Sequence, residues 1–466
     1  MGLREGTLPD RLFDVAIVGA GAVGCAVARE LSGRGARCVL LEAGPDVGAG
    51  TSKANTAILH TGFDAKPGTL EARLVARGYE LLSEYAEQVG IPTARLGALM
   101  VAWNGEQREA LAGVEAGARE NGYEDARPVA VGELYAREPQ LGPGAQGALE
   151  VPGEGIVCPF TATLAFATEA LGSRCELALS AGVSGVRASG GGHLIETARG
   201  QVRANYVVNA AGLRSDEVDA MLGHSDFRVT PRRGELIVFD KLARGLVNHV
   251  LLPVPTEKTK GVLVSPTVYG NVLLGPTADD IDDKTDRSTT AAGLAALMEA
   301  GSRVMPRLVE HEVTATYVGL RAATEHRDYQ LVAHPDQNYV CAGGIRSTGI
   351  TGSLAIAEWV GEALADAGLS LDPRAASSGM QMPNIGEYGS RPYQDDELIG
   401  REPDYGRIVC FCERVTRGEI HAALRGSIPP VDADGLRRRT RALMGRCQGF
   451  YCGAEIARSL EVGRGD

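Results

Sequence analysis

The sequence Asp14-Val15-Ala16-Ile17-Val18 runs directly into Gly19-Ala20-Gly21-Ala22-Val23-Gly24, and this junction decides the fold. The first five residues predict a short buried strand, and the apolar spacing that follows predicts a helix to about Gly33. A second strand is predicted at Cys38-Val39-Leu40-Leu41, and Glu42 ends it. A strand, a G-x-G-x-x-G turn, a helix, a second strand and a terminal acid in this order are typical of a dinucleotide-binding βαβ unit.

Each glycine and the acid have an expected task in such a unit. Gly19 permits a tight turn, Gly21 lets the backbone approach a pyrophosphate, and Gly24 lets the helix pack closely on the strand. The free N–H groups and the partial positive charge of the helix N-terminus favour a phosphate there. Glu42 lies 18 residues after Gly24, where such units place the carboxylate that accepts hydrogen bonds from a ribose.

Composition and charge predict a globular protein with an excess of acid. Of the 466 residues, 44% are hydrophobic and 23% charged, and the formal net charge is −12 without a dominant basic tract. A surface of that charge argues against nucleic acid as a partner. The apolar runs are strand-sized, so no direct membrane span is expected, and residues 1–11 lack the apolar stretch of a signal peptide. We therefore expect a cytoplasmic protein, with any membrane attachment supplied by a partner.

The chain then leaves the dinucleotide unit twice and returns to it each time. We predict helices over 70–89, 105–121 and 160–173, strands over 97–103, 181–186 and 204–212, and a strand-rich stretch over about 227–324. A hairpin is predicted around Tyr269-Gly270 within that stretch. The last return is a strand at 339–342, followed by glycines and hydroxyl side chains before a helix that runs to about Ala367.

This organisation favours FAD over NAD as the cofactor. An NAD-dependent enzyme needs two mononucleotide halves in a continuous fold, whereas this chain has one fingerprint in a domain interrupted twice. We predict an α/β fold, with a Rossmann-like FAD-binding domain interrupted by a mainly antiparallel β substrate domain and followed by a small C-terminal module. The expected bounds are 13–90, 150–226 and 325–370 for the FAD-binding domain, 91–149 and 227–324 for the substrate domain, 371–404 for a linker, and 405–466 for the module.

Residues 14–42, 50–63, 206–212 and 339–353 resemble the glutathione-reductase-type FAD domain of the D-amino-acid-oxidase superfamily. The run 50–63, Arg233-Gly234-Glu235, the hairpin at 261–278 and residues 344–351 more narrowly resemble FAD-dependent glycerol-3-phosphate dehydrogenases and 2-hydroxyglutarate oxidases. This resemblance covers about residues 13–370. It implies a set of cofactor-binding residues: Gly19, Gly21, Gly24, Glu42, Thr51, Ser52, Asn55, Val183, Ala211, Gly212, Gly344, Thr348, Gly349 and Thr351.

Four of the nine cysteines gather near the C-terminus in the pattern C-x-C, 34 residues, C-x4-C: Cys410, Cys412, Cys447 and Cys452. Four thiolates are what a [2Fe-2S] cluster needs. Zinc also accepts four cysteines, but C-x-C is tighter than its commonest spacings, and a reducing compartment disfavours disulfides. We predict a [2Fe-2S] cluster, with zinc as the alternative.

The module resembles the BFD-like, bacterioferritin-associated-ferredoxin-type [2Fe-2S] domain. Fused to the FAD domain, it makes the whole chain similar to the large subunits of anaerobic glycerol-3-phosphate dehydrogenases. Flavin and cluster together imply a dehydrogenase, because a flavin accepts a hydride as two electrons and a cluster passes electrons one at a time. The resemblance implies glycerol 3-phosphate oxidation to dihydroxyacetone phosphate, with electrons passing onward to a partner subunit or a quinone pool.

Candidate catalytic residues follow from this resemblance. His60 comes after the flavin-facing run and is the candidate base or orienter, with a packing histidine as the alternative. Arg321 and Arg346 are expected at strand ends near the cofactor, where a guanidinium fork suits a phosphate or a carboxylate. Arg321 is therefore expected to bind substrate and assist catalysis, and Lys260 to add positive charge beside them.

Two questions stay open at this stage. A phosphate and a carboxylate both suit these arginines, so L-2-hydroxyglutarate, another 2-hydroxy acid or an amino acid is the alternative substrate. A third possibility is a non-catalytic subunit that keeps its cofactors for structure. The basic run Arg437-Arg438-Arg439-Thr440-Arg441 is typical of a solvated helix face, and we hypothesise that it docks an electron-accepting subunit.

Overall fold

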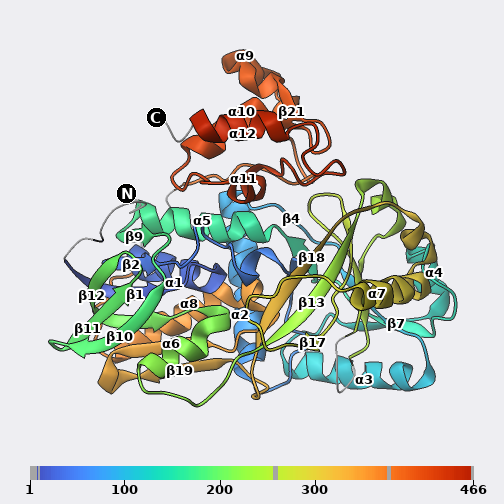
Figure 1. Cartoon of the computed structure of the whole chain (residues 1–466). Coiled ribbons are helices and arrows are strands. Elements are labelled where there is room, and N and C mark those ends of the chain that lie inside the picture. Colours follow the sequence, from blue (N-terminus) through green and yellow to red (C-terminus); the bar gives the residue numbers. More distant parts are fainter. Residues whose placement is uncertain (1–7, 9–10, 256–260, 375–378, 463–466) are drawn as a thin grey trace.

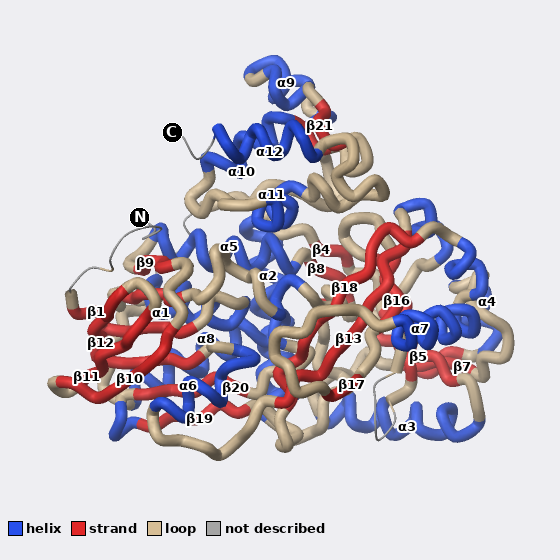
Figure 2. The backbone as a smooth tube through the Cα atoms, in the orientation of Figure 1, coloured by secondary structure: helices blue, strands red, loops and turns tan. Residues whose placement is uncertain are grey.

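The structure is a computed structural model that describes residue 8 and residues 11–255, 261–374 and 379–462. Two large sheets lie beside one another, and the C-terminal module rests across them, with helix α11 facing the main body (Figure 1). Helices surround the first sheet, whereas the second is largely a strand layer with helices at its rim (Figure 2). No described helix is long and apolar enough to cross a membrane.

The first sheet contains the dinucleotide unit. Its order is β10-β11-β12-β1-β2-β9, with β20 also paired to β12 and β19 paired to β20. The strands are β1 (Leu12–Val18), β2 (Cys38–Leu41), β9 (Cys175–Ala178), β10 (Val183–Ser189), β11 (Gly192–Thr197), β12 (Gly200–Asn209), β19 (Gln330–His334) and β20 (Tyr339–Gly343). Strands β20, β12, β1, β2 and β9 run parallel, which brings the chain's separate returns to one sheet.

Helices cover this parallel core. The helices of the chain are α1 (Ala22–Gly33), α2 (Leu70–Val89), α3 (Gly105–Glu120), α4 (Val131–Arg137), α5 (Pro159–Gly172), α6 (Ser215–Met221), α7 (Ala291–Val304), α8 (Gly349–Asp366), α9 (Asp396–Arg401), α10 (Arg417–Arg425), α11 (Ala433–Thr440) and α12 (Gly453–Val462). Helix α1 packs between α5 and α8, and α2 packs on α8. The predicted helices over 70–89, 105–121 and 160–173 are confirmed to within a residue at each end.

The second sheet is mainly antiparallel, as predicted. Its order is β17-β13-β16-β15-β14-β5-β7-β6, with β18 paired to β13. The strands are β5 (Ala98–Ala102), β6 (Arg127–Val129), β7 (Gly147–Val151), β13 (Thr230–Phe239), β14 (Val250–Pro253), β15 (Leu263–Pro266), β16 (Val272–Gly275), β17 (Asp279–Asp280) and β18 (Val313–Ala323). The predicted hairpin at Tyr269-Gly270 joins β15 to β16. A small sheet of β3 (Ile58–Leu59), β8 (Gly155–Val157) and β4 (Thr93–Ala94) connects the two parts.

The C-terminal module is built on strands β21 (Ile408–Cys410) and β22 (Val415–Thr416) and helices α10 to α12. The capping box that Thr416 and Glu419 predict is present at the start of α10. The stretch predicted as a linker contains the short helix α9, and its Arg391 is buried against Glu419, 3.1 Å away. This stretch is therefore tied to the module by a buried ion pair as well as by the chain.

Candidate functional site

The glycine turn between β1 and α1 is packed as tightly as its sequence predicts. Gly19 has φ +102, which favours glycine. A Cβ on Gly24 would lie 1.8 Å from the Gly19 carbonyl oxygen, so only glycine lets α1 approach the turn this closely. Glu42 accepts a hydrogen bond from the Ala20 amide at 2.7 Å and one from the Gly44 amide at 2.7 Å, which places its carboxylate at the turn.

The segment after this unit runs along the turn. Ser52 Oγ accepts a hydrogen bond from the first amide of α1, Ala22, at 2.9 Å, and it lies 3.2 Å from the position of a Cβ on Gly21. Asn55 closes its own loop by bonding Ser52 and Ala57, and Thr51 donates to the Leu320 carbonyl on β18. The segment therefore ties the nucleotide turn to the second sheet.

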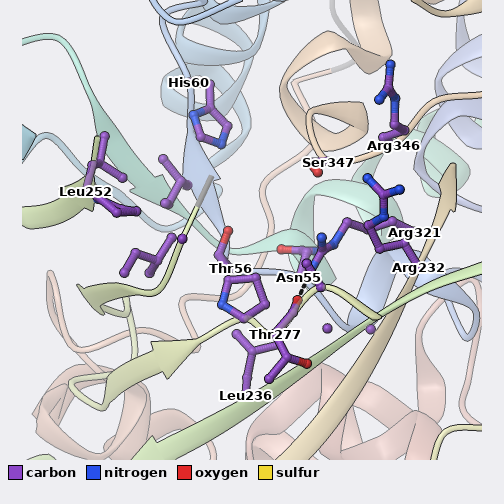
Figure 3. Close-up of a pocket in the computed structure, with 18 of the residues that line it drawn as sticks. Asn55, Thr56, His60, Arg232, Leu236, Leu252, Thr277, Arg321, Arg346 and Ser347 are labelled. Atoms are coloured by element: carbon purple, nitrogen blue, oxygen red, sulfur yellow. Dashed lines mark hydrogen bonds between the residues drawn. The ribbon is translucent and has the colours of Figure 1, made fainter. Parts of the chain in front are cut away.

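A pocket of about 220 Å³ opens where this segment meets the second sheet. Figure 3 shows Arg232, Arg321 and Arg346 on one side of it and His60 across from them. The pocket is lined by residues of the 51–60 segment, β13, β18 and the loop before α8. The two predicted cationic side chains that the structure describes, Arg321 and Arg346, thus share one cavity with His60.

Arg321 and Arg232 are direct cross-strand neighbours on β18 and β13. Arg321 donates to the Thr277 carbonyl at 2.6 Å, and Arg232 is paired with Asp280 at 2.6 and 2.9 Å. Burial, and next the positive charge of Arg232, lower the pKa of Arg321 to about 10. Because the surroundings disfavour the charged form of Arg321, an anion bound in the pocket would stabilise that form.

His60 is paired with a buried carboxylate. Its Nδ1 lies 3.2 Å from Glu154 Oε2, and Glu154 is fully buried. The other oxygen of Glu154 accepts hydrogen bonds from the Thr61 amide at 2.6 Å and the Thr61 hydroxyl at 3.0 Å. The His60 amide donates to Thr351 Oγ1 at 3.1 Å. Thr351 therefore positions the backbone of His60, and Glu154 positions its ring.

The four clustered cysteines form two thiol pairs, Cys410 with Cys452 and Cys412 with Cys447. The backbone N–H groups of Tyr451, Gly449 and Phe450 donate to the Cys447 sulfur and lower its pKa, Tyr451 most strongly. Burial raises the pKa of Cys410 to about 11, although two backbone N–H groups donate to its sulfur. In the described part of the chain, no three His, Cys, Asp or Glu side chains converge on one point as ligands of a single metal ion.

Residues 14–363 match the model of the FAD dependent oxidoreductase family. This chain belongs to that family. Residues 408–461 match the model of the BFD-like [2Fe-2S] binding domain. The chain is therefore an FAD-dependent oxidoreductase that carries an iron–sulfur domain, and both predicted cofactors are confirmed at the level of the family.

Similar proteins extend over most of this FAD-dependent oxidoreductase. The glycerol 3-phosphate dehydrogenase of Caloramator mitchellensis is 33% identical over 452 residues, which cover 96% of this chain and 94% of that protein. The L-2-hydroxyglutarate dehydrogenase of Indibacter alkaliphilus is 30% identical over 272 residues, 57% of this chain and 68% of that protein. The structure of L-alpha-glycerophosphate oxidase from Mycoplasma pneumoniae with FAD bound is 29% identical, with a TM-score of 0.75 over 80% of this chain and 100% of that one.

The residues of the oxidoreductase fit both cofactors. At the turn, backbone stands where a Cβ on Gly19 or Gly24 would lie, so only glycine fits there, and the N-terminus of α1 that follows suits a pyrophosphate. Two thiol pairs suit the two irons of a [2Fe-2S] cluster better than a single zinc ion, which would gather four ligands on one point. N–H groups that donate to the sulfurs are a further feature of cluster sites.

The remaining predicted cofactor residues occupy three other places beside the first sheet. Val183 begins β10, whereas Ala211 and Gly212 follow the end of β12. Gly344 follows β20, and its φ is +63. Thr348, Gly349 and Thr351 form the start of α8, where Thr348 bonds Tyr329 and Glu71. Their contacts with FAD stay predictions, and Lys260 lies outside the described residues.

The hypothesis about the basic run is wrong for three of its arginines. Arg438, Arg439 and Arg441 are buried, so they are neither a solvated face nor free to meet a partner. Arg438 and Arg439 bond the buried carboxylate of Asp46 at 2.6 to 2.7 Å, just after β2 in the FAD domain. The run instead holds the iron–sulfur domain against the flavin domain.

Arg441 reaches the substrate domain. Its guanidinium lies over the Tyr269 ring at 4.0 Å and bonds Asn271 at 3.2 Å. Beside it, a pocket of about 380 Å³ is lined by residues of all three parts of the chain, among them Asn55, Phe160, Tyr269, Met444 and Gln448. Asn55 also lines the first pocket, so the segment that contains it borders both cavities.

Sequence analysis missed two residues of the site: Arg232, which lines the pocket, and Glu154, which pairs with His60. Glu154 stands in a loop without a recognisable motif and lies 94 residues from His60. Arg232 directly precedes the Arg233-Gly234-Glu235 run that carries the family resemblance, and its alternation along a predicted strand was the available signal.

Proposed function

We propose that this chain oxidises glycerol 3-phosphate to dihydroxyacetone phosphate with bound FAD. The observation that carries the proposal is a single pocket with a partly buried arginine on one side and a carboxylate-held histidine on the other. The extent of similarity to a glycerol 3-phosphate dehydrogenase supports the same substrate.

Arg321 and Arg346 are proposed to bind the phosphate. Arg346 donates to the His326 carbonyl at 3.2 Å, at the side of the pocket where Arg321 and Arg232 lie. A phosphate dianion offers oxygens to more than one guanidinium at once. Binding it here leaves the carbon end of a three-carbon substrate to extend toward His60.

His60 is proposed to accept the hydroxyl proton at a ring nitrogen. When bound, FAD supplies the acceptor for the hydride that leaves the carbon carrying this hydroxyl group. Glu154 lies 3.2 Å from Nδ1, so its carboxylate orients the ring and stabilises the imidazolium that forms when the ring accepts the proton. The electrons are proposed to leave through the iron–sulfur domain to a partner or a quinone pool.

An anaerobic absorbance titration of the FAD- and cluster-loaded protein tests this function. Glycerol 3-phosphate is expected to bleach the flavin band, whereas L-2-hydroxyglutarate is expected to leave it oxidised. Bleaching by L-2-hydroxyglutarate alone would overturn the phosphate assignment and leave the oxidoreductase assignment standing. A loaded flavin that neither compound reduces, although dithionite does, would overturn the proposed dehydrogenase function.

The alkaline limb of the pH profile tests the role of Arg321. The guanidinium binds phosphate only as a cation, and its pKa is lowered to about 10. We therefore expect kcat/KM for glycerol 3-phosphate to fall as pH rises through that value. Arg232→Met removes the charge that lowers this pKa, so the fall should move to higher pH. An unchanged profile in the variant would contradict the assignment.

A further inference from the structure

Three aromatic side chains stand exposed on the loops that carry the cluster cysteines. Phe411, between Cys410 and Cys412, is 70% exposed, whereas Phe450 and Tyr451, directly before Cys452, are 83% and 72% exposed. The rings of Phe450 and Tyr451 meet edge to face with 5.3 Å between centroids. Large rings are normally buried, and an exposed group of them marks an interaction site.

These loops have an inner and an outer side. Met444 and Gln448 line the pocket shared with the flavin domain, so this side of the loops faces the source of electrons. Cys410 and Cys452 are buried, whereas Cys412 and Cys447 are partly exposed. The cluster cysteines therefore share their loops both with residues that line the interdomain pocket and with the three exposed aromatic residues.

The charge of the module differs from that of the rest of the chain. Residues 405–466 contain 11 arginines and 7 acids, a net charge of +4 against −12 for the whole chain. Among the described residues of the module, the exposed charged side chains are Arg407, Arg414, Arg425, Arg446, Arg458 and one acid, Glu461. Four of these arginines, Arg407, Arg414, Arg425 and Arg446, also pair with acids of this chain, which offsets part of the positive charge.

Resting on the proposed function, we propose that Phe411, Phe450 and Tyr451 form the docking surface for an acidic one-electron carrier protein. The apolar centre and the arginines around the module match a partner with an apolar patch among carboxylates. Each substrate molecule releases two electrons and two protons. Two oxidised carrier molecules take one electron each, and the protons go to solvent.

The soluble domain of cytochrome b5 is a suitable acidic one-electron probe, with basic cytochrome c as its counterpart. We expect the loaded protein to bind oxidised cytochrome b5 in a calorimeter and to reduce it faster than cytochrome c at low salt. In F411A/F450A/Y451A, binding and reduction of cytochrome b5 should fall roughly tenfold or more, because buried aromatic residues dominate such interfaces. Flavin bleaching by glycerol 3-phosphate should not change.

Val462→Ala is the matched control, since Val462 is an exposed apolar residue of the same module on α12, ten residues beyond Cys452. If the triple variant loses its cluster signal, Phe450→Ala and Tyr451→Ala are tested separately. Wild-type behaviour of these variants, a preference for cytochrome c, or transfer only to quinone-containing vesicles would each overturn the proposal. If glycerol 3-phosphate does not reduce the flavin, the protein is reduced photochemically instead. Electron transfer to cytochrome b5 should then still occur, which separates a wrong substrate from a wrong docking surface.

Discussion

His60→Ala is expected to slow anaerobic reduction of the flavin by glycerol 3-phosphate by roughly 100- to 10,000-fold, the usual contribution of a positioned acid or base. His60 lines the pocket, and Glu154 lies 3.2 Å from its Nδ1. Stopped-flow absorbance at the flavin band measures this rate directly. If His60 acts as the base, imidazole added to the solution should restore part of the rate, which lost packing alone would not allow.

The structure offers a matched control for this prediction. His249 is also held by a fully buried acid, Glu138, at 2.7 Å, but it does not line the substrate pocket. His249→Ala removes a similar pair and should leave the rate of flavin reduction nearly unchanged. Equal slowing in both variants, or a His60→Ala protein that keeps more than about a tenth of the rate, would argue against the base role.

Glu154→Gln separates orientation from proton transfer. The amide keeps the size of the side chain but loses the charge that faces the His60 ring. We expect a smaller decrease than in His60→Ala, with little effect on the affinity for glycerol 3-phosphate, because Glu154 is a positioning residue. A loss of substrate affinity without a loss of rate would instead place Glu154 in substrate binding.

Local signals in the sequence were sufficient for much of the fold. Helix α2 begins and ends where its spacing predicts, since Thr69 caps its first turn and Gly90 adopts the left-handed conformation after its last. The tight packing of α1 on the glycine turn was predictable because a Cβ on Gly24 would meet the Gly19 carbonyl oxygen of the same turn. In both cases the deciding contacts lie between residues close in sequence or within one βαβ unit.

Long-range partners could not be predicted in the same way. The run Arg437 to Arg441 has the composition of a solvated helix face. Its buried members Arg438 and Arg439 pair with Asp46, which lies almost 400 residues earlier in the sequence. Helix α11 itself had a start signal, because Asp432 accepts a hydrogen bond from the Gly435 amide. No local pattern in the sequence predicts which face of that helix packs against another domain.

Breaking the contact between the two cofactor domains is expected to destabilise the chain strongly. Asp46→Asn is expected to lower the free energy of unfolding of the loaded chain by about 3–5 kcal/mol, the usual cost of breaking a buried ion pair. Asp46 is 2% exposed and accepts from Arg438 at 2.6 Å and from Arg439 at 2.7 Å. The variant keeps the shape of the side chain, but Arg439 loses its carboxylate partner and Arg438 keeps only Asp434.

Asp14→Asn is the control, because Asp14 pairs at 3.2 Å with a largely exposed arginine, Arg37, and such a pair is worth about 1 kcal/mol or less. Denaturant titration of both variants measures the difference in stability. Equal stability of Asp46→Asn and wild type would mean that these arginines do not hold the domains together.

The same variant should uncouple the two cofactor domains kinetically. Glycerol 3-phosphate should still bleach the flavin at the wild-type rate, because Asp46 does not line the substrate pocket. The spectroscopic signal of the reduced cluster should then grow more slowly than in the wild type, since the iron–sulfur domain is no longer held on the flavin domain. The loop of Asp46 also touches the nucleotide turn, where the Gly48 amide donates to the Ala20 carbonyl at 2.8 Å. We therefore expect weaker retention of FAD as well, and a variant that slows flavin reduction but not cluster reduction would contradict this account of the interface.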